Sequence, residues 1–267
     1  MTATFPPVVQ AIFAEFVPIC KGLAGEQRYA ISVGGSLGKG TWDGRSDVDF
    51  RLFTDERVPW PEVAPELWAE CLAAIERWKE RGVNIDGVWP RTVGEIDEAV
   101  DAWLRGEIRP VPVVWTIWGY HVLTDVRNQY VIEDPYDIIG SWRDRLRVYP
   151  PALKQAILRK YTGSLRYWRH DYHYAHKVER GDAVFLAGMA AKLVHEVMQV
   201  LFALNETYFA GDGANLAFAE KFVIVPQNFA LRVQAILYPP AEDMFARQYG
   251  ELMGLIDEVL VLAAPVP

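Results

Sequence analysis

The stretch Val33-Gly34-Gly35-Ser36, followed after ten residues by Asp47-Val48-Asp49-Phe50, decides the fold of the N-terminal half of this chain. Strand-like runs lie on both sides, at 29–33 and 48–53. Because side chains alternate along a strand, Asp47 and Asp49 should point to the same face. Two adjacent carboxylates repel each other unless a hard divalent cation such as Mg²⁺ lies between them. The small Gly-Gly-Ser turn offers backbone N–H groups and a hydroxyl to a phosphate. Together these features predict a metal site beside a phosphate site, as phosphoryl or nucleotidyl transfer requires.

This pattern resembles the signature of the nucleotidyltransferase superfamily typified by DNA polymerase beta. That signature is a hydrophobic residue, Gly and Gly or Ser, then about ten residues, then Asp-hydrophobic-acidic-hydrophobic. The local Ser46-Asp47-Val48-Asp49 also matches the small branch that modifies antibiotics and proteins. The alternative is an ordinary strand-to-helix turn followed by a strand with two surface aspartates. A P-loop is excluded, because only three residues separate Gly34 from Gly38, and Gly40 follows Lys39 where Ser or Thr is needed.

Composition limits the function classes. The 267 residues are 51% hydrophobic and carry a net charge of −8, which argues against a general nucleic-acid binder. The two cysteines, Cys20 and Cys71, imply neither a disulfide framework nor a zinc cluster. The N-terminus lacks a basic leader, and no uncharged apolar run is long enough to span a membrane. We therefore expect a cytoplasmic protein.

Periodicity predicts an α+β fold, with a mixed β-sheet domain at 1–147 followed by a helical bundle at 148–267. In the first domain, helical spacing occupies 7–23, 62–81, 93–105 and 136–147, and strand patterns occupy 29–33, 48–53, 83–89 and 113–123. Thr92 and Glu95 form a predicted capping box. Helical patterns in the second domain occupy 152–180, 182–208, 214–223, 227–238 and 241–262.

The resemblance implies a third carboxylate on a strand next to Asp47 and Asp49. Asp86 is the candidate, because it lies on the next predicted strand and shares parity with Asn84. Other acidic candidates are Asp97, Asp101 and Asp125. The expected triphosphate contacts are drawn from the glycine turn, the loop after it and the helical domain: Gly35, Ser36, Lys39, Arg45, Lys177 and Lys192. For each lysine and for Arg45 the alternative is a solvated surface charge.

The resulting hypothesis is a Mg²⁺-dependent enzyme with a two-metal site held by Asp47, Asp49 and Asp86. It would transfer AMP from ATP to a hydroxyl of a small molecule such as an aminoglycoside or lincosamide antibiotic. Two alternatives remain open: modification of a protein or RNA, as in toxin–antitoxin nucleotidyltransferases, and a catalytically silent nucleotide-binding protein. A membrane partner is not expected, nucleic acid is disfavoured, and the chain could form a homodimer.

Overall fold

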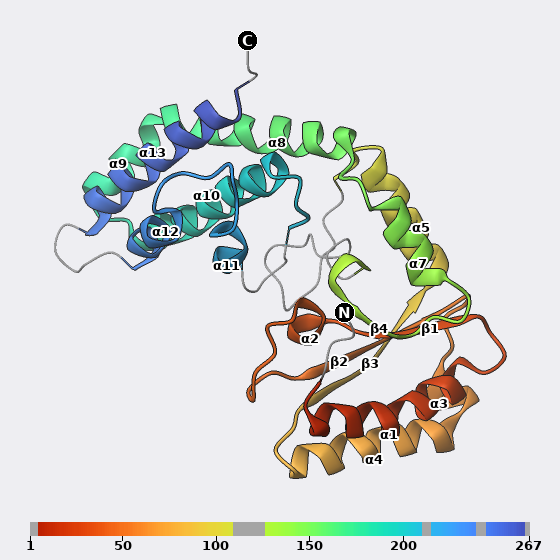
Figure 1. The fold of residues 1–267 in the computed structure, drawn as a ribbon. Helices are drawn as coiled ribbons and strands as arrows, with labels where there is room; N and C mark the ends of the chain where they lie inside the picture. Colours follow the sequence, from red (N-terminus) through yellow and green to blue (C-terminus); the bar gives the residue numbers. More distant parts are fainter. Residues whose placement is uncertain (1–4, 109–125, 210–214, 239–243, 265–267) are drawn as a thin grey trace. The chain divides into compact units, whose positions relative to one another are not determined.

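The structure, a computed structural model, describes residues 5–108, 126–209, 215–238 and 244–264. These residues form two compact units (Figure 1). A sheet unit contains residues 5–101 and 126–147, and a helical unit contains 102–108 and the described residues after 147. The boundary between them falls inside α5 (Val93–Leu104). Each unit is described by itself.

The sheet unit is built on four strands in the order β3-β2-β1-β4. Their bounds are β1 Tyr29–Val33, β2 Val48–Thr54, β3 Ile85–Thr92 and β4 Tyr130–Glu133. β1 pairs antiparallel with both β2 and β4, whereas β2 and β3 are parallel. The sheet is therefore mixed, and β1 and β2 occupy its centre.

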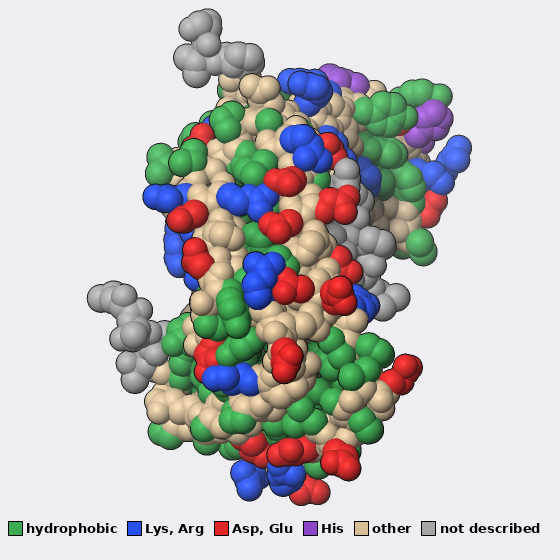
Figure 2. All heavy atoms as spheres, turned by 90° about the vertical axis from the view of Figure 1, so that its right-hand side faces the viewer, with side chains coloured by type: hydrophobic (Ala, Val, Ile, Leu, Met, Phe, Trp, Pro, Cys, Tyr) green, Lys and Arg blue, Asp and Glu red, His purple; other side chains and the backbone are tan. Residues whose placement is uncertain are grey.

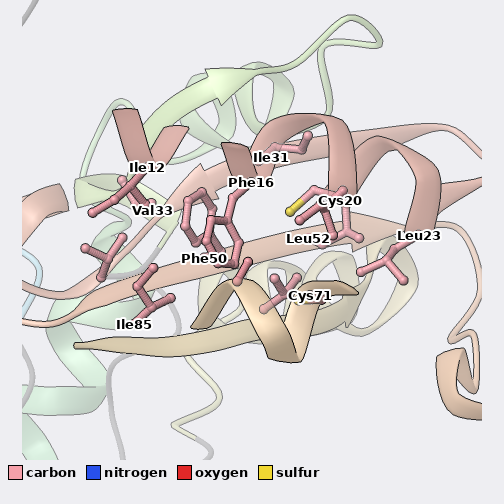
Figure 3. Close-up of a cluster of buried hydrophobic side chains, with 14 of the residues drawn as sticks. Ile12, Phe16, Cys20, Leu23, Ile31, Val33, Phe50, Leu52, Cys71 and Ile85 are labelled. Carbon is pink, nitrogen blue, oxygen red and sulfur yellow. The ribbon is translucent and has the colours of Figure 1, made fainter. Parts of the chain in front are cut away.

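Two helices, α1 (Pro7–Ala24) and α4 (Pro65–Glu80), pack on one face of this sheet. Figure 3 shows their inward side chains meeting those of the strands, with Phe16 of α1 stacked on Phe50 of β2. Cys20 and Cys71 are both free and buried in this core. Other helices in this unit are α2 Gly35–Lys39, α3 Trp60–Val63 and α7 Ile138–Arg145.

Two strands differ from the sequence prediction. β3 continues past Pro90 to Thr92. Proline has no backbone N–H to donate, and it is tolerated here because β3 is an edge strand with a neighbour on one side alone in the described sheet. β4 was not predicted, since it is only four residues long and its sequence shows no apolar–polar alternation. The capping box is confirmed: Thr92 N–H donates to Glu95 Oε2 at 3.2 Å, and Glu95 N–H donates to Thr92 Oγ1 at 3.1 Å. The strand pattern predicted at 113–123 lies outside the described residues.

Helices are the only regular elements among the described residues after 147. They are α8 Pro151–His170, α9 Tyr172–Arg180, α10 Ala183–Leu204, α11 Asn215–Ala219, α12 Phe229–Leu237 and α13 Met244–Leu262. The single helix predicted at 152–180 is instead two helices, because Asp171 caps α9 by accepting a hydrogen bond from His173 N–H at 2.7 Å. α10 is the central helix, with 13 of its 22 residues buried. The α+β fold class is confirmed.

Two helices, α1 and α10, are long and apolar enough to cross a membrane by length and composition alone. Of their most apolar windows, 39% and 67% of the residues are buried inside the protein. Core helices of globular proteins have the same character.

Candidate functional site

The two faces of β2 carry different chemistry. Val48, Phe50 and Leu52 are fully buried in the core formed with α1 and α4. Because strand side chains alternate, Asp49 and Arg51 point to the opposite face. Asp47 is exposed directly before the strand, at the position that continues this alternation. Asp49 therefore lies on the face opposite the hydrophobic core, and the face that it is expected to share with Asp47 stays a prediction.

The glycine turn lies directly against this second face. Gly34 N–H donates to the backbone carbonyl of Asp49 at 3.0 Å. Gly35 has φ of +56°, and a Cβ built there would lie 2.3 Å from Asp49 Oδ2. Only glycine combines this backbone conformation with so close an approach. The turn and the acidic strand therefore form one local unit, with the Asp49 carboxylate against the Gly35 backbone.

Ser36 offers a hydrogen-bonding group at the same place. It lies in the short helix α2, and its Oγ is buried without a hydrogen-bond partner among the residues that the structure describes. A buried hydroxyl is costly to leave unpaired, so its presence favours a ligand that supplies an acceptor. Gly38 fixes the position of α2, since a Cβ there would lie 2.6 Å from the carbonyl oxygen of Asn128, just before β4.

Arg51 lies beside Asp49 and the glycine turn, and the sequence analysis did not identify it. Its side chain is only 9% exposed, and its Nη1 lies 3.9 Å from Oδ1 of Asp49, whose side chain is 15% exposed. A Cβ at Gly34 would lie 3.0 Å from Arg51 Nη2. The signal was present in the sequence: an arginine two residues after Asp49, in a strand whose other residues are mostly apolar. Arginine is rarely buried without a charged neighbour, so an arginine in this strand indicates a charge pair with the nearby aspartate.

The loop between α2 and β2 holds two predicted basic contacts. Asp43 closes the loop by accepting hydrogen bonds from Arg45 N–H at 2.9 Å and Ser46 Oγ at 3.0 Å. The bond from the Arg45 backbone, followed by that from Ser46, holds the pKa of Asp43 below its ordinary value. The Arg45 residue is exposed, and Lys39 is half-buried at the end of α2. Their roles at a triphosphate stay predictions.

Asp86 lies on β3, the strand that pairs with β2, at a position where the pairing register between the two strands shifts. The β2–β3 register passes from Val48 opposite Ile85 to Asp49 opposite Gly87, which makes Asp86 the extra residue of a bulge. The alternation of side chains counted from Asn84 therefore does not determine on which face of the sheet the Asp86 side chain lies. Asp86 is exposed, and its Oδ2 accepts a hydrogen bond from Trp89 Nε1 at 3.0 Å. Trp89 in turn lies in register opposite Arg51, and is 41% exposed.

Within the described part of the chain, no three His, Cys, Asp or Glu side chains are grouped so that they could hold a metal ion. Mg²⁺, however, is commonly held by one or two carboxylates together with substrate phosphates rather than by a complete protein cage. The two carboxylates that the sequence predicts for that mode of binding are Asp47 and Asp49. The role of Asp86 as a third carboxylate stays a prediction.

Two of the alternative acidic candidates have structural partners. Asp97 accepts hydrogen bonds from Trp142 Nε1 at 2.9 Å and from Arg145 Nη1 at 2.6 Å. Asp101 pairs with the same arginine. These contacts tie α5 to α7 within the sheet unit. Asp125 lies outside the described residues.

The two predicted lysine contacts belong to the helical unit. Lys177 Nζ donates to Asp182 Oδ2 at 2.7 Å, and this bond holds the pKa of Asp182 below its ordinary value. Lys192 Nζ lies 2.5 Å from Glu196 Oε1 and 5.6 Å from the centre of the Trp168 ring. Each lysine thus has a carboxylate neighbour in its own unit.

A family model described as a domain of unknown function (DUF4037) matches residues 115–212. Among curated proteins, none matches this sequence. A distant structural resemblance exists to a nucleotidyltransferase-like protein from Exiguobacterium sibiricum 255-15. That resemblance covers 95% of this chain and 74% of the other, with 9% sequence identity and a TM-score of 0.44.

Proposed function

We propose that this protein is a Mg²⁺-dependent nucleotidyltransferase that moves a nucleoside monophosphate, with ATP as the expected donor, onto a hydroxyl of a small acceptor. The observation that supports it best is the contact between the glycine turn and the acidic strand. Gly35 is kept free of a side chain where Asp49 Oδ2 approaches, and the unpaired Ser36 Oγ lies beside it. A carboxylate and a hydrogen-bond donor that share one small-residue turn suit a metal-bound phosphate.

The chain's residues divide the proposed work. Ser36 and the backbone N–H groups of the turn would hold triphosphate oxygens, and Asp47 and Asp49 would orient the metal-bound phosphates. Asp86 would accept the proton of the attacking hydroxyl or join the metal ligands. Mg²⁺, when bound, would neutralise charge on the phosphate oxygens. The hydroxyl oxygen would form a bond to the α-phosphorus while the bond to pyrophosphate breaks, and positioning would supply most of the acceleration.

The acceptor follows only from the resemblance of the motif to the branch that modifies antibiotics. We propose a small hydroxylated molecule such as an aminoglycoside or lincosamide. On the face shown in Figure 2, acidic and basic side chains lie interspersed, consistent with the overall charge of −8. Such a surface offers little to the phosphate backbone of a nucleic acid.

Isothermal calorimetry with ATP tests this proposal. The wild type should bind ATP in a Mg²⁺-dependent manner, and Asp47→Asn/Asp49→Asn should lose that binding while keeping its fold. A matched control, Asp55→Asn/Asp144→Asn, removes the same charge from two acidic residues that pair with Arg28 and Arg147. The control should bind ATP like the wild type. Failure of the folded wild type to bind any nucleoside triphosphate would contradict the proposal.

If binding is confirmed, pyrophosphate release identifies the acceptor class. Release that depends on an aminoglycoside or lincosamide supports the small-molecule reaction. Release only with RNA or a protein would instead assign the same site to macromolecule modification. Tight Mg²⁺-dependent binding without release for any acceptor class would indicate a nucleotide-binding protein.

A further inference from the structure

The face of the sheet that carries Asp49 continues onto β3. Val88 is buried in the core formed with α1 and α4, so the residues on either side of it, Gly87 and Trp89, lie on the opposite face. The β2–β3 register places Gly87 opposite Asp49 and Trp89 opposite Arg51. Gly87 has no side chain, and no atom of the described residues lies within 4 Å of a Cβ built there. The sheet is therefore open beside Asp49, and the Trp89 indole is the next side chain on that face of β3.

Trp89 is exposed and yet held in place. The residue is 41% exposed, and its Nε1 donates to Asp86 Oδ2 at 3.0 Å. Residues three apart on a regular strand point to opposite faces, so this bond depends on the bulge at Asp86. Bulges occur often next to active sites, where they redirect a side chain. The indole thus has a defined orientation, a surface open to solvent and a carboxylate at its edge.

The order of the strands separates the two ends of the proposed reaction. The glycine turn follows β1, and β3 lies on the other side of β2. In the proposed reaction the turn holds the pyrophosphate that leaves, and the attacking and leaving oxygens lie roughly in line across the α-phosphorus. The attacking hydroxyl therefore approaches from the β3 side of β2, which is where Trp89 and Asp86 lie.

We propose that Trp89 is the binding platform for the acceptor, and that the acceptor is built on saturated, hydroxylated rings. This inference rests on the proposed function and specifies the substrate class of the same site. One face of such a ring presents C–H groups, which pack on the electron-rich face of an indole, and its hydroxyl groups point outward to hydrogen-bonding partners. The Asp86 carboxylate, to which no described side chain other than Trp89 hydrogen bonds, lies at the indole edge and can accept one of them. An open-chain alcohol offers no such flat face.

Calorimetric titration with kanamycin A, an aminoglycoside made of saturated rings, tests this proposal in the presence of Mg²⁺ and a nonhydrolysable ATP analogue. The wild type should bind kanamycin A. Trp89→Leu should bind it about fivefold to tenfold more weakly because the aromatic face is lost, and Trp89→Phe should lose less because a ring remains. Tyr136→Leu is the matched control, since it removes another exposed aromatic ring of the sheet unit, one that follows β4. Its affinity for kanamycin A should equal that of the wild type.

The indole N–H resonance of Trp89 gives a second readout in the wild type. It is identified as the signal missing from the ¹H–¹⁵N spectrum of Trp89→Phe, and it should shift when kanamycin A is added. A loss of affinity in Trp89→Leu without this shift would show that the effect is indirect and would overturn the platform role.

Equal affinity for kanamycin A in Trp89→Leu and the wild type, or no binding of kanamycin A by the wild type, would also overturn the proposal. So would weaker binding of the ATP analogue by Trp89→Leu with unchanged affinity for kanamycin A, because the indole would then stack on the nucleobase instead. Failure of the proposed function is a separate result, since it appears as no Mg²⁺-dependent binding of the ATP analogue by the wild type.

Discussion

Each unit of this protein contains a shielded carboxylate with a basic neighbour, and the two arrangements differ. In the helical unit, Glu196 is 8% exposed and meets Lys192 at 2.5 Å, with the lysine side chain 44% exposed. In the sheet unit, Asp49 is 15% exposed and Arg51 9% exposed, and their nearest charged atoms are 3.9 Å apart. The helical pair is therefore in direct contact and reaches solvent, whereas the sheet pair is enclosed and lies beyond hydrogen-bonding distance.

The difference indicates what each pair is for. A short contact between residues four apart on one helix is an ordinary local pair that stabilises that helix. A buried cation held just beyond hydrogen-bonding distance of a carboxylate gains less from it than a direct contact would give. The Asp49–Arg51 pair instead lies against the two glycines of the turn, so it belongs to the candidate site. Four predictions test this contrast.

Gly35→Ala should have the largest effect. The methyl group would collide with Asp49 Oδ2, and the φ of +56° would cost about 1–2 kcal/mol for any L-residue. We expect loss of Mg²⁺-dependent ATP binding by calorimetry and a lower free energy of unfolding. Gly44→Ala is the control, since no atom lies within 4 Å of a Cβ there. Normal binding by Gly35→Ala would show that the contact with Asp49 does not shape the site.

Lys192→Met should destabilise the protein more than Lys177→Met. Within the described part of the chain, Glu196 Oε2 is buried without a hydrogen-bond partner, so loss of Lys192 leaves a shielded carboxylate without its cation, at a cost of about 1–3 kcal/mol. Lys177 and Asp182 are both more than one third exposed, and a pair of that kind contributes less than about 1 kcal/mol. Denaturant unfolding measures both changes. Loss of ATP binding by either folded variant would instead support its predicted contact with the triphosphate.

His195 should make stability depend on pH. Burial, with a smaller contribution from Lys160 and Lys192, lowers the pKa of this histidine to about 4. Between that value and the ordinary pKa of about 6.5, the unfolded chain binds more protons than the folded one. This contribution to stability is thus complete above pH of about 6.5 and declines as the pH falls toward 4, by about 1–2 kcal/mol between pH 7 and 5. His195→Gln should flatten this part of the curve, and an unchanged slope would contradict the assignment.

Asp86→Asn should have the smallest effect. The amide oxygen can still accept the hydrogen bond from Trp89, but the negative charge is lost. If Asp86 joins the metal ligands, Mg²⁺-dependent ATP affinity should fall about 3- to 10-fold, less than for Asp49→Asn, because the phosphates and two carboxylates remain. Trp89→Phe is the companion variant, since it removes the same hydrogen bond and keeps the charge. Affinity unchanged in Asp86→Asn but reduced in Trp89→Phe would assign Asp86 to the orientation of Trp89 instead.

Much of the fold could be predicted because its elements have strong local signals. The alternation of β2, the capping box at Thr92 and the helical periodicity after Pro151 are all properties of contiguous residues. β4 could not be predicted, because its four half-buried residues become a strand only by pairing with β1. The extension of β3 through Pro90 depended on its place at the sheet edge, which no local pattern shows.

Local sequence patterns likewise predicted one part of the candidate site and not the other. Spacing alone placed Gly35 and Asp49 in one motif, and the structure brings them into contact. The direction of Asp86 could not be predicted, because the bulge in β3 interrupts the alternation on which the prediction rested. Arg51 could have been identified from its parity with Asp49, but a single charge in a strand looks like a surface residue until the burial of that strand is known.

The position of β4 has a consequence for synthesis of the chain. β1, the turn and β2 form one continuous segment, and β3 follows soon after, but in the described sheet the second edge of β1 pairs with β4, about a hundred residues downstream of β1. Until that strand leaves the ribosome, β1 presents unpaired backbone groups to any other chain. A fragment that stops before Tyr130 would keep the whole glycine turn and the acidic strand. It would also expose β1 as an unpaired edge strand and would be expected to aggregate. The part of the protein that holds the proposed chemistry therefore depends on a late strand to stay soluble.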